Sequence, residues 1–314
     1  MKISRQMYYN RVLDPAIEVL VKKDYAWLIQ KVIDMPELDF QTISTKISIY
    51  RGTSSIVSLN KKGKISADKA YMELYPDFYA NPTPKTFAEL LRRVNNDRRF
   101  DRYYQSENKK KEGFYQNLIS RRYTLHCRPE DDIIIVDKEF VIGYENQDTK
   151  DRILDSIKKK YDRIINQIKV LYPFERWPKD IKQSGEECDF LALTKDGDIL
   201  LLELKQSVDT QKIYLSPLQV GKYADMTKVL LDECSAGFFD VLKKMVEQKR
   251  RIGILKPQWE LPIKFSGKVR TAVVVGGDSS SAAKRKYKQI SEIVGKDTPY
   301  YSCDNDGTLI KVAL

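Results

Sequence analysis

The stretch Cys188–Gln206, CDFLALTKDGDILLLELKQ, constrains the fold of this chain more than any other. Two apolar runs flank the polar sequence TKDGD, a pattern typical of two antiparallel strands joined by a tight turn. The apolar residues are those that a buried hairpin needs. Three charged residues, Asp189, Glu203 and Lys205, nevertheless lie at the end far from the turn. Charges in a buried hairpin are costly unless they have partners, so these three need an explanation.

Two turns fit the sequence, and they arrange the charges differently. A three-residue loop over 195–197 puts its glycine in the left-handed position that closes a type I turn with a bulge. In that register Asp189 faces Glu203 and Glu187 faces Lys205, with all four side chains on one face. A two-residue loop over 196–197 would instead put Asp189 and Glu203 on opposite faces. We prefer the three-residue loop on turn preferences, and the alternative stays open.

Two facing carboxylates repel each other and lose solvation when they are partly buried, unless a cation lies between them. Hard oxygen ligands at this spacing suit Mg²⁺ or Mn²⁺, which keep several waters and bridge to substrate phosphates. Lys205, one step beyond Glu203 on the same face, would orient or activate a water and stabilise a charged phosphate. The simpler interpretation is that Asp189 ends a strand and that Glu203–Lys205 forms a solvated strand end. A Glu-x-Lys triplet alone is common in a chain with 32% charged residues.

Composition limits the class of protein and of partner. A chain of 314 residues is long enough for one large domain or two ordinary ones. Its formal net charge of +11 favours a polyanionic partner such as nucleic acid. The first residues lack the apolar core of a secretory signal, and no stretch approaches the ~18 apolar residues of a membrane span. We therefore expect a soluble cytoplasmic protein that makes no contact with membranes.

The cysteines and the histidine exclude some kinds of site. Four scattered cysteines without a C-x-x-C pair indicate buried thiols in a reducing compartment. His126 is the only histidine, which leaves little for histidine-rich zinc sites or a Ser-His-Asp triad. Its neighbours suggest a strand or a strand end.

The chain divides into two parts by pattern. Residues 1–146 read as an α+β domain, and 147–314 read as an α/β domain with the hairpin at its centre. In the first part we expect helices within 15–35 and 84–95, strands within 45–50, 55–59, 123–127, 132–136 and 140–144, and a solvated loop leading into a helix over 101–123. In the second part we expect helices over 151–171, 238–251 and 279–295, a buried strand over 269–277 and a closing hairpin over 300–314. We expect a further helix to begin after Ser216 as its N-cap, with Pro217 at its first position.

At the hairpin the sequence resembles the PD-(D/E)XK nuclease superfamily, whose hallmark is an aspartate at the start of one strand and Glu-x-Lys on the next. Here these are Asp189 and Glu203-Leu204-Lys205. The order of helix, hairpin, helix and strand is also similar. Gln219 and Tyr223 form a Q-x-x-x-Y pair on the following helix, which is typical of the RecB-like branch. Residues four apart share one helix face.

The resemblance implies a restriction-endonuclease-like mixed sheet flanked by helices in the C-terminal half. It also implies that Asp189, Glu203 and the carbonyl of Leu204 hold Mg²⁺ or Mn²⁺, that Lys205 positions the attacking water, and that Gln219 and Tyr223 contact DNA or hold the metal ligands. The family often has a further acid on its first helix. The candidates for it are Glu187, which is nearest by strand geometry, and Asp151, Asp155, Asp162 and Glu175. Clustered downstream cysteines are lacking, so an iron–sulfur cluster is not expected.

The resulting expectation is a metal-dependent nuclease that hydrolyses phosphodiester bonds of DNA and leaves 5′-phosphate products. By analogy alone, such a protein would act in DNA repair, mobile-element biology or antiviral defence. The N-terminal part would supply substrate selection, a homodimer contact or a partner-subunit surface. The alternatives are a non-cleaving nucleic-acid-binding or scaffolding protein on a nuclease-like fold, and an RNA-cleaving enzyme.

Overall fold

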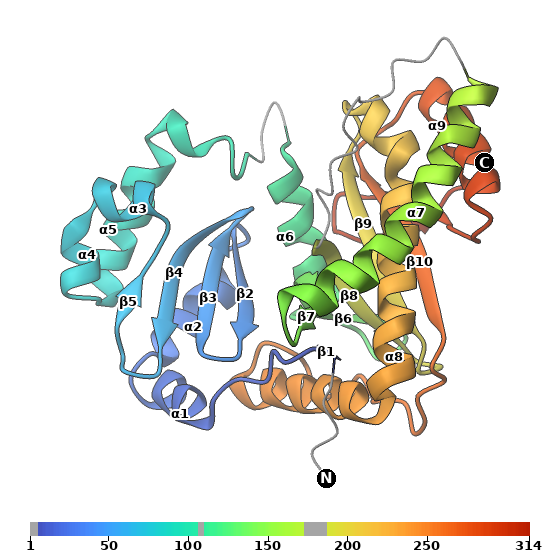
Figure 1. The fold of residues 1–314 in the computed structure, drawn as a ribbon. Coiled ribbons are helices and arrows are strands. Elements are labelled where there is room, and N and C mark those ends of the chain that lie inside the picture. Colours follow the sequence, from blue (N-terminus) through green and yellow to red (C-terminus); the bar gives the residue numbers. More distant parts are fainter. Residues whose placement is uncertain (1–5, 106–109, 173–186) are drawn as a thin grey trace.

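The computed structural model describes residues 6–105, 110–172 and 187–314. Within these residues the chain is mixed α/β and forms two lobes, with helix α6 between their sheets (Figure 1). No helix of these three ranges is long and apolar enough to cross a membrane.

The N-terminal lobe is built on a small antiparallel sheet with the strand order β2-β3-β4-β5. Its elements are α1 (Pro15–Lys23), α2 (Ala26–Asp34), β2 (Leu38–Ile43), β3 (Lys46–Arg51), β4 (Ser54–Asn60), β5 (Ile65–Ser66), α3 (Lys69–Leu74), α4 (Pro76–Ala80), α5 (Pro84–Asn95) and the 3₁₀ turn η1 (Arg98–Phe100). The helices expected within 15–35 and 84–95 and the strands expected within 45–50 and 55–59 are confirmed. Strand β2 was not predicted.

The second lobe is built on a mixed sheet with the order β12-β11-β10-β9-β8-β6. Its elements are α6 (Glu112–Arg122), β6 (Ile133–Val141), α7 (Gln147–Leu171), β8 (Glu187–Thr194), β9 (Ile199–Gln206), α8 (Thr210–Ile252), β10 (Val269–Gly276), α9 (Ser281–Val294), β11 (Tyr300–Cys303) and β12 (Leu309–Lys311), with β1 (Met7–Tyr8) and β7 (Gly143–Tyr144) paired beside it. Strand β8 is antiparallel to both of its neighbours, β6 and β9, and β10 runs parallel to β9 and β11. The closing hairpin is confirmed as β11–β12.

The mixed sheet extends across the predicted domain boundary at residues 146–147. Strand β6 precedes that boundary, yet it is hydrogen bonded to β8. Helix α6 also precedes the boundary, and its Tyr115 and Ile119 pack with apolar residues of the same sheet.

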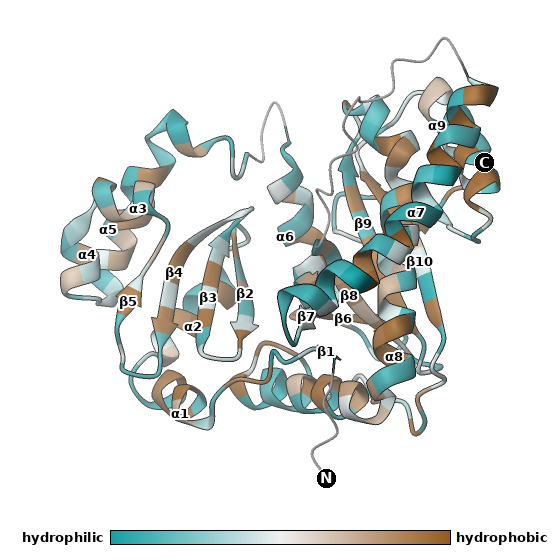
Figure 2. Cartoon of the chain, viewed as in Figure 1, coloured by the Kyte–Doolittle hydropathy of each residue, from teal (hydrophilic) through white to brown (hydrophobic). Residues whose placement is uncertain are grey.

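Both faces of the sheet are covered, which explains why its central strands are nearly continuous apolar runs. Leu191 and Leu201 belong to a core shared with α7, α8 and α9. Phe190 and Leu204, which point the other way, belong to a core shared with α6. Figure 2 shows the central strands mostly brown and α7 teal over much of its visible surface. Glu203 has the parity of Leu201, so its side chain lies on the face that carries α8.

Helix α8 differs from the prediction at both of its expected boundaries. It begins at Thr210, and Pro217 lies inside it instead of at its first position. Because proline has no N–H for the carbonyl of Ile213, that carbonyl would be left without its helical partner. The Ser216 hydroxyl donates to it at 2.6 Å, so Ser216 supports the helix interior and is not its N-cap. The expected helix over 238–251 is the continuation of α8 beyond a kink at Cys234 (φ −153°, ψ 43°).

The strand expected over 123–127 is wrong, because the segment forms turns after α6. The Thr124 hydroxyl donates to the carbonyl of Ser120 at 2.7 Å, and the amide of His126 donates to Arg121 at 2.9 Å. The amide of His126 is thereby used within the turn instead of in a strand pair, and the Thr124 hydroxyl ties the turn to the end of α6. His126 therefore lies in a turn and not at a strand end.

Candidate active site

The turn of the hairpin is the three-residue loop, so the preferred register is confirmed. Gly197 has a φ of +79°, and its amide donates to the carbonyl of Thr194 at 3.0 Å. The strand pairs run from Leu193 opposite Ile199 to Phe190 opposite Leu202. A side chain at position 197 would also collide with a neighbouring loop, since its Cβ would lie 2.3 Å from the carbonyl oxygen of Lys264. Glycine is thus required here for two separate reasons.

Beyond Phe190 the two strands of the hairpin are no longer paired, and a carboxylate side chain accepts the next backbone hydrogen bond. The alternation of the ladder would direct the amide of Leu204 to the carbonyl of Cys188. Instead, this amide donates to Oδ2 of Asp189 at 2.7 Å. The half-buried Asp189 carboxylate therefore lies between the ends of β8 and β9, beside Glu203 and Lys205. We call Asp189, Glu203 and Lys205 the charged cluster.

Glu203 and Lys205 are almost fully buried within this cluster. Their side chains are 2% and 9% exposed, and Nζ of Lys205 donates to Oε1 of Glu203. The other oxygen, Oε2 of Glu203, is buried and has no hydrogen-bond partner among the described residues. A buried oxygen without a partner is costly, and such groups mark positions where a ligand, an ion or a water completes the site.

The electrostatics of the cluster follow from its burial. Burial raises the pKa of Glu203, the charge of Asp189 raises it further and Lys205 opposes both, which gives a pKa of about 8. Burial also raises the pKa of Asp189, against the attraction of Lys205. For Lys205, burial lowers the pKa, but the charges of Glu203 and Asp189 outweigh it and leave the pKa above its usual value. Lys205 is therefore an ammonium at neutral pH.

Helix α8 brings both residues of its predicted pair to this region. Nε2 of Gln219 donates to the hydroxyl of Tyr223 at 3.2 Å. Burial raises the pKa of Tyr223, and the charge of Glu203 raises it further. The charge of Glu203 therefore acts on the Tyr223 hydroxyl, and the hydrogen bond from Gln219 orients that hydroxyl.

The further acid nearest the cluster is one that the sequence did not suggest. Glu112 is half-buried at the start of α6, where burial and the charge of Asp189 raise its pKa while Lys205 lowers it. Glu112 in turn raises the pKa of Glu203. The signal for it is that α6 is the helix immediately before β6, but the predicted boundary at 146–147 places that helix in the other domain.

The acids that the sequence did suggest lie elsewhere. Glu187 is exposed at the first position of β8, opposite Val141 of β6. On α7, Asp151 accepts a hydrogen bond from Gln147 and Asp155 pairs with Lys159, both at 2.7 Å. The exposed Asp162 lies on the same helix, and Glu175 falls outside the described residues.

The donor set of the cluster fits a hard divalent cation in part. Asp189 and Glu203 provide two carboxylates, and Oε2 of Glu203 is free to accept a ligand bond. Mg²⁺ needs only one or two protein carboxylates, because waters and substrate phosphates complete its octahedron. No group of three or more His, Cys, Asp or Glu side chains gathers at metal-binding spacing in the described parts of the chain. The Leu204 carbonyl stays a prediction as a third ligand.

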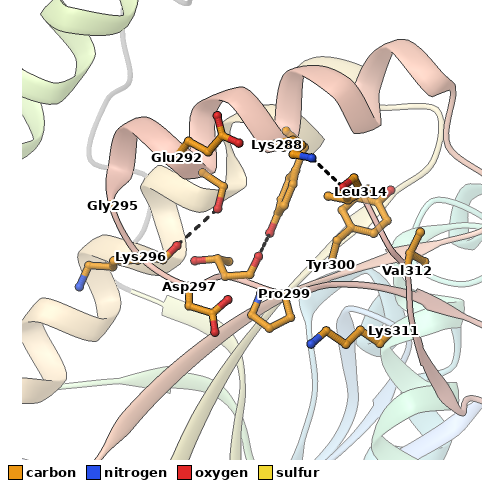
Figure 3. A pocket seen from close by; sticks show the side chains of 13 residues that line it. Lys288, Glu292, Gly295, Lys296, Asp297, Pro299, Tyr300, Lys311, Val312 and Leu314 are labelled. Carbon is orange, nitrogen blue, oxygen red and sulfur yellow. Dashed lines mark hydrogen bonds between the residues drawn. The ribbon is translucent and has the colours of Figure 1, made fainter.

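A hollow of about 370 Å³ lies at a different place, between the end of α9 and the residues after it. Figure 3 shows Lys288 reaching the carbonyl oxygen of Leu314, with Tyr300 beside Leu314. No residue of the charged cluster lines this hollow.

Comparison of the chain with protein-family models, with curated proteins and with solved structures gives no match.

Proposed function

We propose that this protein is a metal-dependent nuclease that hydrolyses phosphodiester bonds, with DNA as its substrate. The observation that carries the proposal is the convergence of Asp189, Glu203 and Lys205 where β8 and β9 separate, with Oε2 of Glu203 buried and unpartnered. A buried carboxylate oxygen without a donor beside it is a position that a bound cation can complete.

The arrangement of the second lobe also supports the proposal. Its order α7, β8, β9, α8, β10 has the helix, hairpin, helix and strand that the resemblance to PD-(D/E)XK nucleases implies, and α6 and β6 precede them. The Q-x-x-x-Y pair lies on α8, directly after the Glu-x-Lys strand, and its tyrosine is coupled to Glu203. Glu112 supplies the helix acid that this family often has, here from α6.

In this mechanism Asp189 and Glu203 would hold the cation. When bound, a divalent cation supplies Lewis-acid stabilisation of the charge that develops on the phosphate. Lys205, which stays protonated, donates a hydrogen bond to the attacking water or to a phosphate oxygen and does not act as the base. Attack of the water on phosphorus forms one P–O bond and breaks the bond to the 3′ oxygen; the proton released by the water passes to solvent and a solvent proton neutralises the 3′ oxygen, which leaves a 3′-hydroxyl and a 5′-phosphate. Tyr223, oriented by the hydrogen bond from Gln219, would contact the DNA near Glu203.

The test is a cleavage assay on linear, circular and single-stranded DNA and on RNA, with Mg²⁺ or Mn²⁺ and with a chelator. Asp189→Asn and Lys205→Gln should each lower the metal-dependent rate by about 10²-fold or more. Matched controls come from the same hairpin: Asp196→Asn and Lys195→Gln change the same residue types at exposed turn positions and should leave the rate unchanged. Thermal melts show whether each variant is folded. Cutting that survives both cluster substitutions would overturn the assignment, and binding without cutting would favour the non-cleaving alternative.

A further inference from the structure

The charged cluster has little contact with solvent, which limits the shape of any substrate that reaches it. The side chains of Glu203 and Lys205 are 2% and 9% exposed, and the start of α6 lies beside them. The phosphates of a duplex lie on the outside of a stiff rod with a persistence length of about 150 base pairs. A single strand bends freely and can direct one phosphate into a recess.

Three lysines lie near the cluster, two directly before α6 and one in the first turn of α8. The carbonyl of Lys110 accepts a hydrogen bond at 2.7 Å from the side chain of Gln206, the residue after Lys205. Lys111 follows it and directly precedes Glu112. Lys212, in the first turn of α8, is 64% exposed and pairs with Asp209 at 3.0 Å, and its charge acts on Glu112. We call Lys110, Lys111 and Lys212 the mouth lysines, because the first two adjoin the end of β9 and Glu112 along the backbone and the third acts on the same acid.

Apolar groups accompany the mouth lysines. The half-buried ring of Phe114 lies 5.0 Å from the ammonium of Lys110. Val208, in the loop between β9 and α8, is 80% exposed. Unpaired bases can pack against such groups, whereas the bases of a duplex are stacked on one another and present only their edges. Cations interleaved with apolar surface are the combination found in proteins that bind single strands.

We propose that Lys110, Lys111 and Lys212, with Phe114 and Val208, form a mouth that admits a single-stranded nucleic acid, and not a duplex, to the charged cluster. This inference rests on the proposed function, since it assigns the substrate of that same site. The mouth lysines contact phosphates on both sides of the reacting one, while Phe114 and Val208 contact the adjacent bases. An end, a gap or a flap of a duplex offers the same unpaired strand.

The test is equilibrium binding of the full chain to a labelled single strand and to the duplex of the same sequence, measured by fluorescence anisotropy with a chelator present. No cleavage occurs under these conditions, so the result is independent of whether the protein is a nuclease. The variant K110A/K111A/K212A is compared with K158A/K243A/K244A, which removes three exposed lysines on α7 and on the second half of α8. A strand without bases separates the contribution of stacking from that of charge.

We expect the wild-type protein to bind the single strand at least tenfold more tightly than the duplex. The mouth variant should lose about tenfold or more, and the dependence of log K on log salt should become shallower by about two units, since each single-strand phosphate contact contributes about 0.7. The control variant should bind as the wild type does. Equal or tighter binding of the duplex overturns the choice of substrate, and equal losses in both triple variants overturn the mouth. Lys212→Glu alone provides the same comparison if the triple variant does not fold.

Discussion

The buried carboxylate of Glu203 predicts how the stability of the metal-free protein depends on pH. Its pKa is about 8 in the folded chain, against an ordinary value of 4.5 that the unfolded chain restores. A group whose pKa is raised by folding contributes its stability below the unfolded value, and that stability is lost as the pH rises through the folded value. Stability should therefore decline from about pH 5 and level off above about pH 8.

The magnitude follows from the linkage relation. With these two pKa values, ionisation of Glu203 should cost roughly 3 kcal/mol of unfolding free energy between pH 5 and pH 8. Asp189, Glu112 and other groups titrate in the same range, so the useful quantity is the difference between the wild-type protein and Glu203→Gln. The glutamine cannot ionise, so this difference isolates the titration of Glu203 from that of the other groups.

The assay is urea denaturation in a chelating buffer at several pH values between 5 and 8. As the pH rises from 5 to 8, we expect the free energy of unfolding of the wild type to fall by roughly 3 kcal/mol relative to that of Glu203→Gln. Glu187→Gln, an exposed glutamate of the adjacent strand, serves as the control and should follow the wild type. Adding Mg²⁺ should stabilise the wild type most at high pH, where the carboxylate is free of its proton. A difference between wild type and Glu203→Gln that does not change with pH would refute the reasoning.

Three further substitutions test separate parts of the site. Gly267→Ala introduces a side chain at a left-handed glycine with open space around it and should lower the free energy of unfolding by about 1 kcal/mol. In Gly197→Ala the new Cβ would lie 2.3 Å from a carbonyl oxygen, so urea denaturation should show a loss roughly 1–3 kcal/mol larger. Equal losses at the two glycines would mean that the contact with the neighbouring loop is unimportant. Glu112→Gln should lower metal-dependent cutting by about tenfold or more, whereas Glu187→Gln should leave the rate unchanged; the reverse order would return the role of the further acid to β8. Tyr223→Phe removes a buried hydroxyl that accepts a hydrogen bond at 3.2 Å. Thermal melts should show a loss of about 1 kcal/mol in stability, and rate measurements on the same variant should show slower cutting.

The hairpin and its register could be predicted because their determinants are local. Gly197 closes a turn that fixes which residues face each other, and the strict alternation of a strand then assigns every side chain to a face. The position of Asp189 beside Glu203 follows from these two rules alone. The spacing of Gln219 and Tyr223 likewise places both on one side of a helix whatever the rest of the chain does.

The rest of the site could not be predicted, because its contacts join distant parts of the chain. Glu112 comes from a helix that precedes β6, and nothing near it in the sequence shows that its helix begins beside the end of β9. The predicted start of α8 is wrong because proline is normally excluded from the interior of a helix. Here the Ser216 hydroxyl donates to the carbonyl that Pro217 leaves without a partner. The sequence over 123–127 has the composition of a strand, but it directly follows α6 and forms the turns that end this helix.

The sequence by itself determined a hairpin with two carboxylates and a lysine at one end of one face. Only the tertiary structure decided how strongly those charges interact, because burial between α6 and α8 sets the dielectric around them and leaves Oε2 of Glu203 without a partner. Turn geometry acts over a few residues and can be inferred from them, whereas desolvation depends on every element packed around a group.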